Sequence, residues 1–262
     1  YNFATGVYQV ELNQFQGTAK FLEWNPSRTQ MLVQVGSRLA FVDAESGNIL
    51  RWSSYPNAFL DYDWGQDFVL TKVTSGAFSV TRVSDGSLVS TFPYSVDTEG
   101  WRNDAKFSPD GSRVIAVGTE YDPLFEIRLR RVWNMNTLTG ATISLWNGGQ
   151  GDFDRIFAVT DDDRLIVHDA YFQTYCALPL AGGTIQWTHN IVGSLRDLDV
   201  SRDQFVTGTT GTANFYSLST GQIVDTVSVP STQAVSAINP DWTVVAAGGS
   251  PGADSNNYSL SF

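Results

Sequence analysis

A short apolar segment that ends at a turn returns six times along this chain. The clearest copy spans residues 107–118, where an apolar strand end is followed by a turn of Pro109, Asp110 and Gly111 and then by a second apolar strand. Pro fixes φ, Asp bonds the turn backbone and Gly accepts positive φ, so all three favour tight turns. The last strand residues before the six turns are Trp24, Trp64, Phe107, Val159, Val200 and Ile238. The steps between them are 40, 43, 52, 41 and 38 residues, which indicates one repeated unit of strands.

The repeat length predicts the fold class. Four-stranded propeller blades recur about every 40 to 45 residues, and we therefore predict an all-β fold, a six-bladed β-propeller of four-stranded antiparallel blades. Five repeats also carry a glycine turn between their third and fourth strands, where tight hairpins need positive φ. These glycines are Gly47, Gly86, Gly140, Gly182 with Gly183, and Gly221.

A single domain is predicted for residues 1–262, because propellers grow as one unit. The last repeat stops one strand short, and residues 7–12 resemble a fourth strand without a blade. We expect this N-terminal strand to pair beside the strand ending at Phe262 and close the ring, which leaves no open sheet edge. Part of a seven-bladed propeller is the alternative. The expected blades are residues 15–53, 57–93, 100–147, 152–188, 194–229, and 233–262 with 1–12.

Charge and composition argue against several kinds of partner. The formal net charge is −11, so nonspecific nucleic-acid binding is not expected. No apolar stretch has the length of a membrane span, so we expect no membrane insertion. A disulfide framework is excluded by the single cysteine, Cys176, which we expect to be a small buried core residue. The chain does not begin with Met, so a processed product or a module of a longer protein is expected.

The third repeat departs most from the pattern. Its step is the longest, and an insertion at residues 119–124, which includes Tyr121, separates its second and third strands. Long connections between short strands are common places for binding sites, because they vary at little cost to stability. We therefore treat Tyr121 as a candidate partner-binding residue, with a plain surface loop as the equal alternative.

Acidic side chains in the first strands are candidates for a metal site. Asp61, Asp104 and Asp197 stand at one level of three repeats, and a ring of carboxylates could bind a cation. We favour a structural role, in which each carboxylate accepts backbone hydrogen bonds or pairs with a neighbouring arginine. We expect His168 to form a local pair with Asp169 and no catalytic dyad. The prediction is therefore no cofactor, no metal and no enzymatic activity.

A partly basic rim is the candidate partner site. Trp101 and Arg102 precede the first strand of the third repeat, and Arg155 and Arg196 occupy equivalent positions in the next two repeats. Trp and Arg are enriched in binding hot spots. These residues could hold an acidic peptide segment of a protein partner. The alternative is that Trp101 packs between blades while the arginines pair with adjacent aspartates.

Three segments resemble the WD-repeat family of β-propellers, and together with the repeat they extend a weak similarity over nearly the whole chain. They are residues 107–111, the triplet Val132, Trp133 and Asn134, and residues 195–201. The Gly-His pair of that family is absent, and Val132-Trp133-Asn134 is the nearest match to its Trp-Asp signature. The resemblance implies a rigid platform for protein partners and favours a cytoplasmic location.

The predicted function is a non-enzymatic protein-interaction scaffold, a propeller module of a larger protein or assembly. Two alternatives remain open. One is a structural subunit of an extracellular or surface assembly, for which the sequon at Asn257 offers a possible glycosylation site. The other is a propeller hydrolase with a metal site in its channel.

Overall fold

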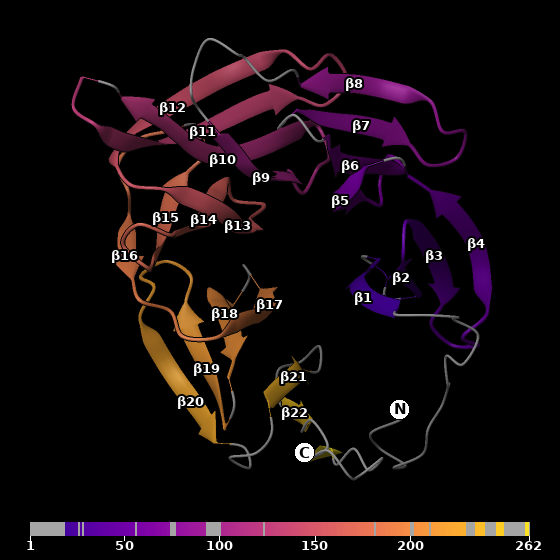
Figure 1. Cartoon of the computed structure of the whole chain (residues 1–262). Helices are drawn as coiled ribbons and strands as arrows, with labels where there is room; N and C mark the ends of the chain where they lie inside the picture. Colours follow the sequence, from indigo (N-terminus) through magenta and orange to yellow (C-terminus); the bar gives the residue numbers. More distant parts are fainter. Residues whose placement is uncertain are drawn as a thin grey trace. The chain divides into compact units, whose positions relative to one another are not determined.

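In the computed structural model, strands make up all the regular structure of the described residues. These are residues 19–25, 27, 29–55, 57–73, 77–92, 101–122, 124–180, 182–199, 202–209, 211–228, 234–238, 245–248 and 260–261. Within each sheet, strands that follow one another in the chain lie next to each other, so each sheet is a simple meander, and Figure 1 shows the strands of each sheet side by side in chain order.

Five sheets in the described part of the chain have four strands. The first contains β1 (Ala19–Trp24), β2 (Gln30–Val35), β3 (Arg38–Asp43) and β4 (Ile49–Ser54). The second contains β5 (Ala58–Asp63), β6 (Phe68–Lys72), β7 (Phe78–Arg82) and β8 (Leu88–Phe92). The third contains β9 (Trp101–Phe107), β10 (Arg113–Asp122), β11 (Ile127–Asn136) and β12 (Thr142–Gln150). The fourth contains β13 (Phe153–Val159), β14 (Arg164–Asp169), β15 (Thr174–Pro179) and β16 (Trp187–His189). The fifth contains β17 (Ser194–Asp199), β18 (Gln204–Gly208), β19 (Thr212–Ser217) and β20 (Ile223–Ser228).

The predicted number of blades is wrong, although the all-β propeller class is right. The last sheet has three described strands, β21 (Ala234–Ile238), β22 (Val245–Gly248) and β23 (Leu260–Ser261), so five blades are complete among the described residues. The prediction counted the first hairpin of each repeat, and a hairpin alone does not guarantee a four-stranded sheet. The segment 7–12 and Phe262, which were expected to complete the last blade, lie outside the described residues.

The structure divides into two compact units, and the division runs through the third sheet. One unit contains residues 1–116 and 134–143, and the other contains residues 117–133 and 144–262. The prediction of a single domain stays a prediction.

Turn chemistry explains where the strands stop. β1, β9, β13 and β21 end at the residues that the repeat predicts, and β5 ends one residue before Trp64. Gly47, Gly86, Gly140 and Gly221 have φ between 70° and 71°, which confirms the predicted glycine turns. Each of these glycines donates its amide to the carbonyl four residues earlier, at 2.8 to 2.9 Å.

Each four-stranded sheet has two chemically different ends, because a meander reverses at every turn. We call one the turn end, which carries the turns between first and second strands and between third and fourth strands. The other is the loop end, which carries the turn between second and third strands and the connection into the next sheet. In the fourth sheet, β14 begins at the turn end with Arg164 and finishes at the loop end with Asp169.

Side-chain packing holds neighbouring sheets of the second unit together. A buried cluster joins Phe157 of the fourth sheet to Phe205 and Tyr216 of the fifth. Trp187 and Phe205 stack with a ring separation of 6.3 Å, and Phe205 stacks on Tyr216 at 5.0 Å. Such buried aromatic pairs contribute both area and geometric specificity. The connections at the ends of the fourth and fifth sheets therefore extend from a well-packed core.

Candidate interaction surface

Large apolar side chains are exposed at the loop end of the second unit. They come from the β10–β11 turn, the β14–β15 turn and the β16–β17 connection. The exposed fractions are 87% for Leu124, 72% for Phe125, 56% for Tyr171, 49% for Phe172 and 57% for Val192. We call these five residues the loop-end patch. Single exposed apolar residues are ordinary, whereas several at one end of neighbouring sheets indicate a contact surface.

The β10–β11 turn shows that the predicted insertion is not a loop. β10 and β11 have 10 residues each, and only residues 123–126 connect them. Asp122 Oδ1 accepts the amides of Leu124 and Phe125 at 2.9 and 3.4 Å, and Glu126 has φ of 55°. The extra residues therefore lengthen a hairpin, and its tip carries Leu124 and Phe125 in a turn with hydrogen bonds of its own.

A buried ion pair supports the β14–β15 turn. The Asp169 side chain is fully buried, and its Oδ2 accepts a hydrogen bond from Arg130 Nε at 2.6 Å. Its other oxygen accepts the amides of Asp152, Tyr171 and Phe172 at 3.2, 3.0 and 3.2 Å. One carboxylate thus fixes the turn that exposes Tyr171 and Phe172 and also the connection that enters the fourth sheet.

Gly151 makes room for this ion pair. A Cβ at Gly151 would lie 2.3 Å from Arg130 Nε and 2.5 Å from Asp169 Oδ2, closer than real atoms approach. Its φ of 153° is one that glycine adopts readily. The close approach of backbone and ion pair therefore requires glycine here.

Polar and cation–π contacts tie the third-sheet hairpin to the fourth-sheet turn. Arg128 pairs with Asp152 at 2.5 Å, and Gln150 donates to the Tyr171 hydroxyl at 3.1 Å. The Arg130 guanidinium lies 5.2 Å from the centre of the Phe172 ring. Tyr171 and Phe172 meet edge to face at 4.8 Å. Strands β11 and β12 of the third sheet are therefore tied to the β14–β15 turn and to the connection that enters the fourth sheet.

The partner-binding residues predicted from sequence all lie toward the loop ends of their sheets. Trp101 and Arg102 begin β9, Tyr121 is near the end of β10, and Arg155 and Arg196 are each the third residue of β13 and β17. Arg155 is exposed, whereas the other four side chains lie outside the described part of the structure. Their role in binding stays a prediction.

The histidine prediction names the wrong partner. His168 Nδ1 contacts Asp154 Oδ1 at 2.6 Å, while Asp169 is bound to Arg130 and to backbone amides. Successive side chains of a strand point to opposite faces, so His168 and Asp169 diverge. Asp154 therefore contacts His168. The ion pair between Arg155 and the adjacent Asp154, which was the alternative to a binding role for Arg155, is not observed among the described residues.

The first-strand aspartates have structural contacts where they are described. Asp61 accepts the Phe107 amide at 2.8 Å and lies 3.7 Å from Lys106 Nζ. Asp104 accepts the Ala105 amide at 2.9 Å, and the Asp197 side chain is outside the described residues. No group of three or more His, Cys, Asp or Glu residues within the described ranges could hold a metal ion.

Two further predictions concern single residues. Cys176 is buried as expected, and burial raises the pKa of its thiol. The Asn257 sequon lies outside the described residues. Among the residues that are described, no helix is long and apolar enough to span a membrane.

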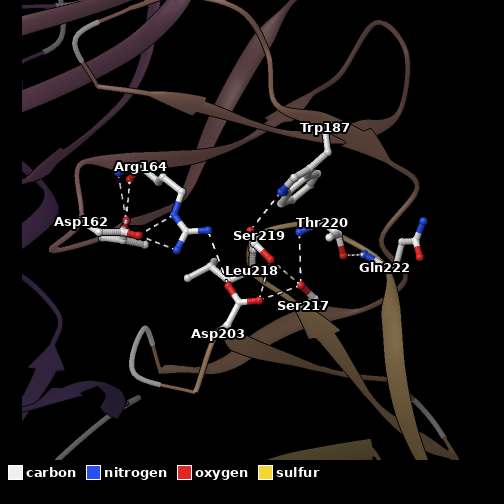
Figure 2. A network of polar contacts seen from close by, with 10 residues as sticks. Asp162, Arg164, Trp187, Asp203, Ser217, Leu218, Ser219, Thr220 and Gln222 are labelled. Atoms are coloured by element: carbon white, nitrogen blue, oxygen red, sulfur yellow. Dashed lines mark hydrogen bonds and ion pairs between the residues drawn. The ribbon is translucent and has the colours of Figure 1, made fainter.

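The turn end of the fourth and fifth sheets is different in kind, as Figure 2 shows. Arg164 reaches Asp162 at 2.5 Å in its own sheet and Asp203 at 3.7 Å in the next. Asp203 also accepts hydrogen bonds from the Ser217 and Ser219 hydroxyls. The polar groups drawn there bind one another, so this end joins two blades.

A tryptophan adds a second link between the same blades. Trp187 Nε1 donates to the Leu218 carbonyl at 3.0 Å, as Figure 2 also shows. Between the third and fourth sheets, Trp146 makes the equivalent bond to the Gly183 carbonyl at 2.9 Å. The outer strand of one blade is thus bonded to the third-to-fourth-strand turn of the next.

Sequence reasoning missed the loop-end patch. A signal was available, since Leu124-Phe125 and Tyr171-Phe172 are large apolar pairs at turn positions, where small and polar residues are usual. The repeat was aligned on the ends of the first strands, so the turns between second and third strands carried no weight in the prediction.

Comparisons with known proteins identify no family for this chain. No protein-family model matches the chain, and no curated protein matches it. Among solved structures, 1146 chains match. One of them is BamB from Moraxella catarrhalis, with 17% sequence identity, a TM-score of 0.48, and coverage of 86% of this chain and 69% of that chain. The WD-repeat resemblance has no support from these comparisons and stays a prediction.

Proposed function

We propose that this chain is a non-enzymatic protein-interaction module that binds a protein partner through the loop-end patch. The observation that carries the proposal is the exposure of Leu124, Phe125, Tyr171 and Phe172 on two turns that are each held by hydrogen bonds to an aspartate. Several exposed apolar side chains at one end of a protein lower its solubility, so their presence on supported turns favours a role in binding.

Rigid presentation supports the proposal further. Asp122 and Asp169 hold the two turns through backbone hydrogen bonds, and Asp169 is fully buried. A surface fixed before binding loses little conformational freedom when the partner docks. Aromatic side chains are also enriched among the residues that dominate binding energy. We therefore expect Phe125 and Phe172 to act as anchors.

Charge beside the patch favours a partner segment that combines apolar and acidic residues. Arg128 is 54% exposed although it pairs with Asp152, and Arg155 is exposed on the first strand of the fourth sheet. The chain as a whole carries a net charge of −11, so a local basic border would favour correct docking over other orientations. The module would then present this surface within a larger protein or assembly.

Differential capture tests the proposal. Three baits are compared: the intact chain, the Phe125→Ser/Phe172→Ser variant and a matched control, Leu88→Ser/Leu138→Ser. The control removes two apolar side chains at the turn ends of their sheets, which are 63% and 57% exposed. We expect a protein retained by the intact chain and the control but lost by the patch variant. Equal retention by all three baits would reject the patch as the binding surface.

A further inference from the structure

A polar cavity opens at the turn end of the first unit, and none of its lining residues belongs to the loop-end patch. Its volume is about 370 Å³. The lining residues come from the first turns of two neighbouring sheets and from β4, and they are Asn25, Gln30, Arg51, Tyr62, Trp64, Gly65 and Asp67. Cavities of a few hundred Å³ with aromatic walls and a few converging polar groups are typical small-molecule sites.

The wall of the cavity is fixed by Arg51. Its guanidinium lies 3.8 Å from the centre of the Phe41 ring and binds both oxygens of Asp67 at 3.0 and 2.5 Å. It also contacts the Tyr62 hydroxyl at 3.0 Å. Burial opposes the ionised form of Asp67, but hydrogen bonds from Arg51 and Tyr62 outweigh it and lower the pKa of that carboxyl. The pair is therefore charged, formally neutral in sum and held in place.

Several donors of this wall have no acceptor among the residues that the structure describes. Three of the five guanidinium N–H groups of Arg51 are taken up by Asp67 and Tyr62. The side-chain amide of Gln30 makes no hydrogen bond to any described residue. The indole N–H of Trp64 is buried and has no acceptor among the described residues. An unpartnered buried donor costs about 1 to 3 kcal/mol, so an acceptor brought against this wall would remove a penalty.

These groups define the chemistry of the ligand. The N–H donors can bind oxygen atoms of a ligand, while the Gln30 side-chain carbonyl can accept a hydrogen bond from a ligand hydroxyl. The Arg51–Asp67 pair has no net charge, so neither an anion nor a cation is favoured. Tyr62 and Trp64 supply aromatic wall for an apolar ring face. We propose that this cavity binds a neutral, hydroxyl-rich ligand of the size of a sugar ring.

The indole ¹⁵N–¹H signal of Trp64 provides a direct test. The signal is identified by its loss in Trp64→Phe, and the chain is titrated with glucose, with methyl β-glucoside and with sodium phosphate. We expect a saturable shift with a sugar and none with phosphate. A shift with the glycoside alone assigns the site to a sugar within a chain, and a shift with glucose assigns it to a free sugar. No shift with either sugar, or a shift with phosphate alone, would overturn the proposal.

A variant that spares the fold tests the role of the donors. Gln30→Ala removes a side chain without hydrogen bonds to the described residues, and we expect sugar affinity to fall about fivefold, the effect of one lost hydrogen bond. Gln222→Ala, which changes an exposed residue at the turn end of the fifth sheet, serves as the control and should bind as the unaltered chain does. An unchanged affinity in Gln30→Ala would contradict the assigned site.

Discussion

Both ends of the fourth sheet contain an arginine–aspartate ion pair, but the two pairs have different roles. At the turn end, Arg164 pairs with Asp162 in its own sheet and with Asp203 in the next sheet, so these polar groups bind one another. At the loop end, Asp169 gathers Arg130 and three backbone amides, and above this pair Tyr171 and Phe172 are exposed. A charged hub at the turn end therefore joins blades, while a similar hub at the loop end supports an apolar surface.

The comparison separates stability from binding. Changes in the turn-end network should lower the free energy of unfolding and leave the loop-end patch intact. Changes in the exposed patch residues should lower partner affinity more than they lower the free energy of unfolding, because these side chains are about half exposed or more. Asp169 belongs to both groups, since it is buried and also positions the patch.

Asp169→Ala should give the largest effect on stability. It leaves the mostly buried Arg130 side chain without its carboxylate and frees three backbone amides, so we expect a loss of about 3 to 5 kcal/mol. Urea unfolding followed by fluorescence measures this value. Asp169→Asn keeps the shape and one acceptor and should cost clearly less. A loss below about 1 kcal/mol in Asp169→Ala would mean that the pair does not support the turn.

Trp187→Phe should have the next largest effect. The indole N–H of Trp187 bonds the Leu218 carbonyl, whereas that of Trp64 has no acceptor among the described residues. Both substitutions shrink a ring, but only the first removes a hydrogen bond. We expect Trp187→Phe to cost about 1 kcal/mol more than Trp64→Phe in parallel urea unfolding experiments. Equal losses would contradict the linking role of Trp187.

Acid should weaken the turn end next. The hydrogen bond from Arg164 lowers the pKa of Asp162, and hydrogen bonds from Ser219 and Ser217 outweigh burial and lower the pKa of Asp203. Because the folded pKa values lie below those of the unfolded chain, about 3.9, this stabilisation is complete above that pH and is lost as the pH falls through the folded values.

A double variant isolates the acid effect. Both carboxylates are partly exposed, so we expect Asp162→Asn/Asp203→Asn to lose below about 1 kcal/mol per pair at neutral pH. Between pH 5 and pH 2, its thermal unfolding temperature should fall less steeply than that of the unaltered chain. Parallel pH profiles of the two proteins would show that the network does not contribute to acid sensitivity.

The blades could be predicted from sequence because their signals are local. Pro109-Asp110-Gly111 and the glycine turns act over a few residues, and strand ends at Trp24, Phe107 and Val159 follow from them. The number of complete blades was missed because it depends on pairing at the chain's last strands, where β23 pairs through only two residues.

The binding surface could not be predicted in the same way, because it depends on contacts distant in the chain. Arg130 and Asp169 are 39 residues apart, and their pairing decides how Tyr171 and Phe172 are displayed. The insertion at residues 119–124 was visible, but sequence did not show that it extends a hairpin. The repeat singled out the third blade correctly and misjudged the form of its extra residues.

The affinity of the captured partner for the patch variant tests the central claim most directly. Phe125→Ser/Phe172→Ser should lose only about 1 to 2 kcal/mol of its free energy of unfolding, because Phe172 contacts Arg130 and Tyr171, and it should remain folded. Its partner affinity, measured by titration calorimetry, should fall by about 30-fold, the effect of losing one strong hot spot. The Leu88→Ser/Leu138→Ser control should bind like the unaltered chain. An affinity for the patch variant equal to that of the control would contradict the assignment of the loop-end patch as the binding surface.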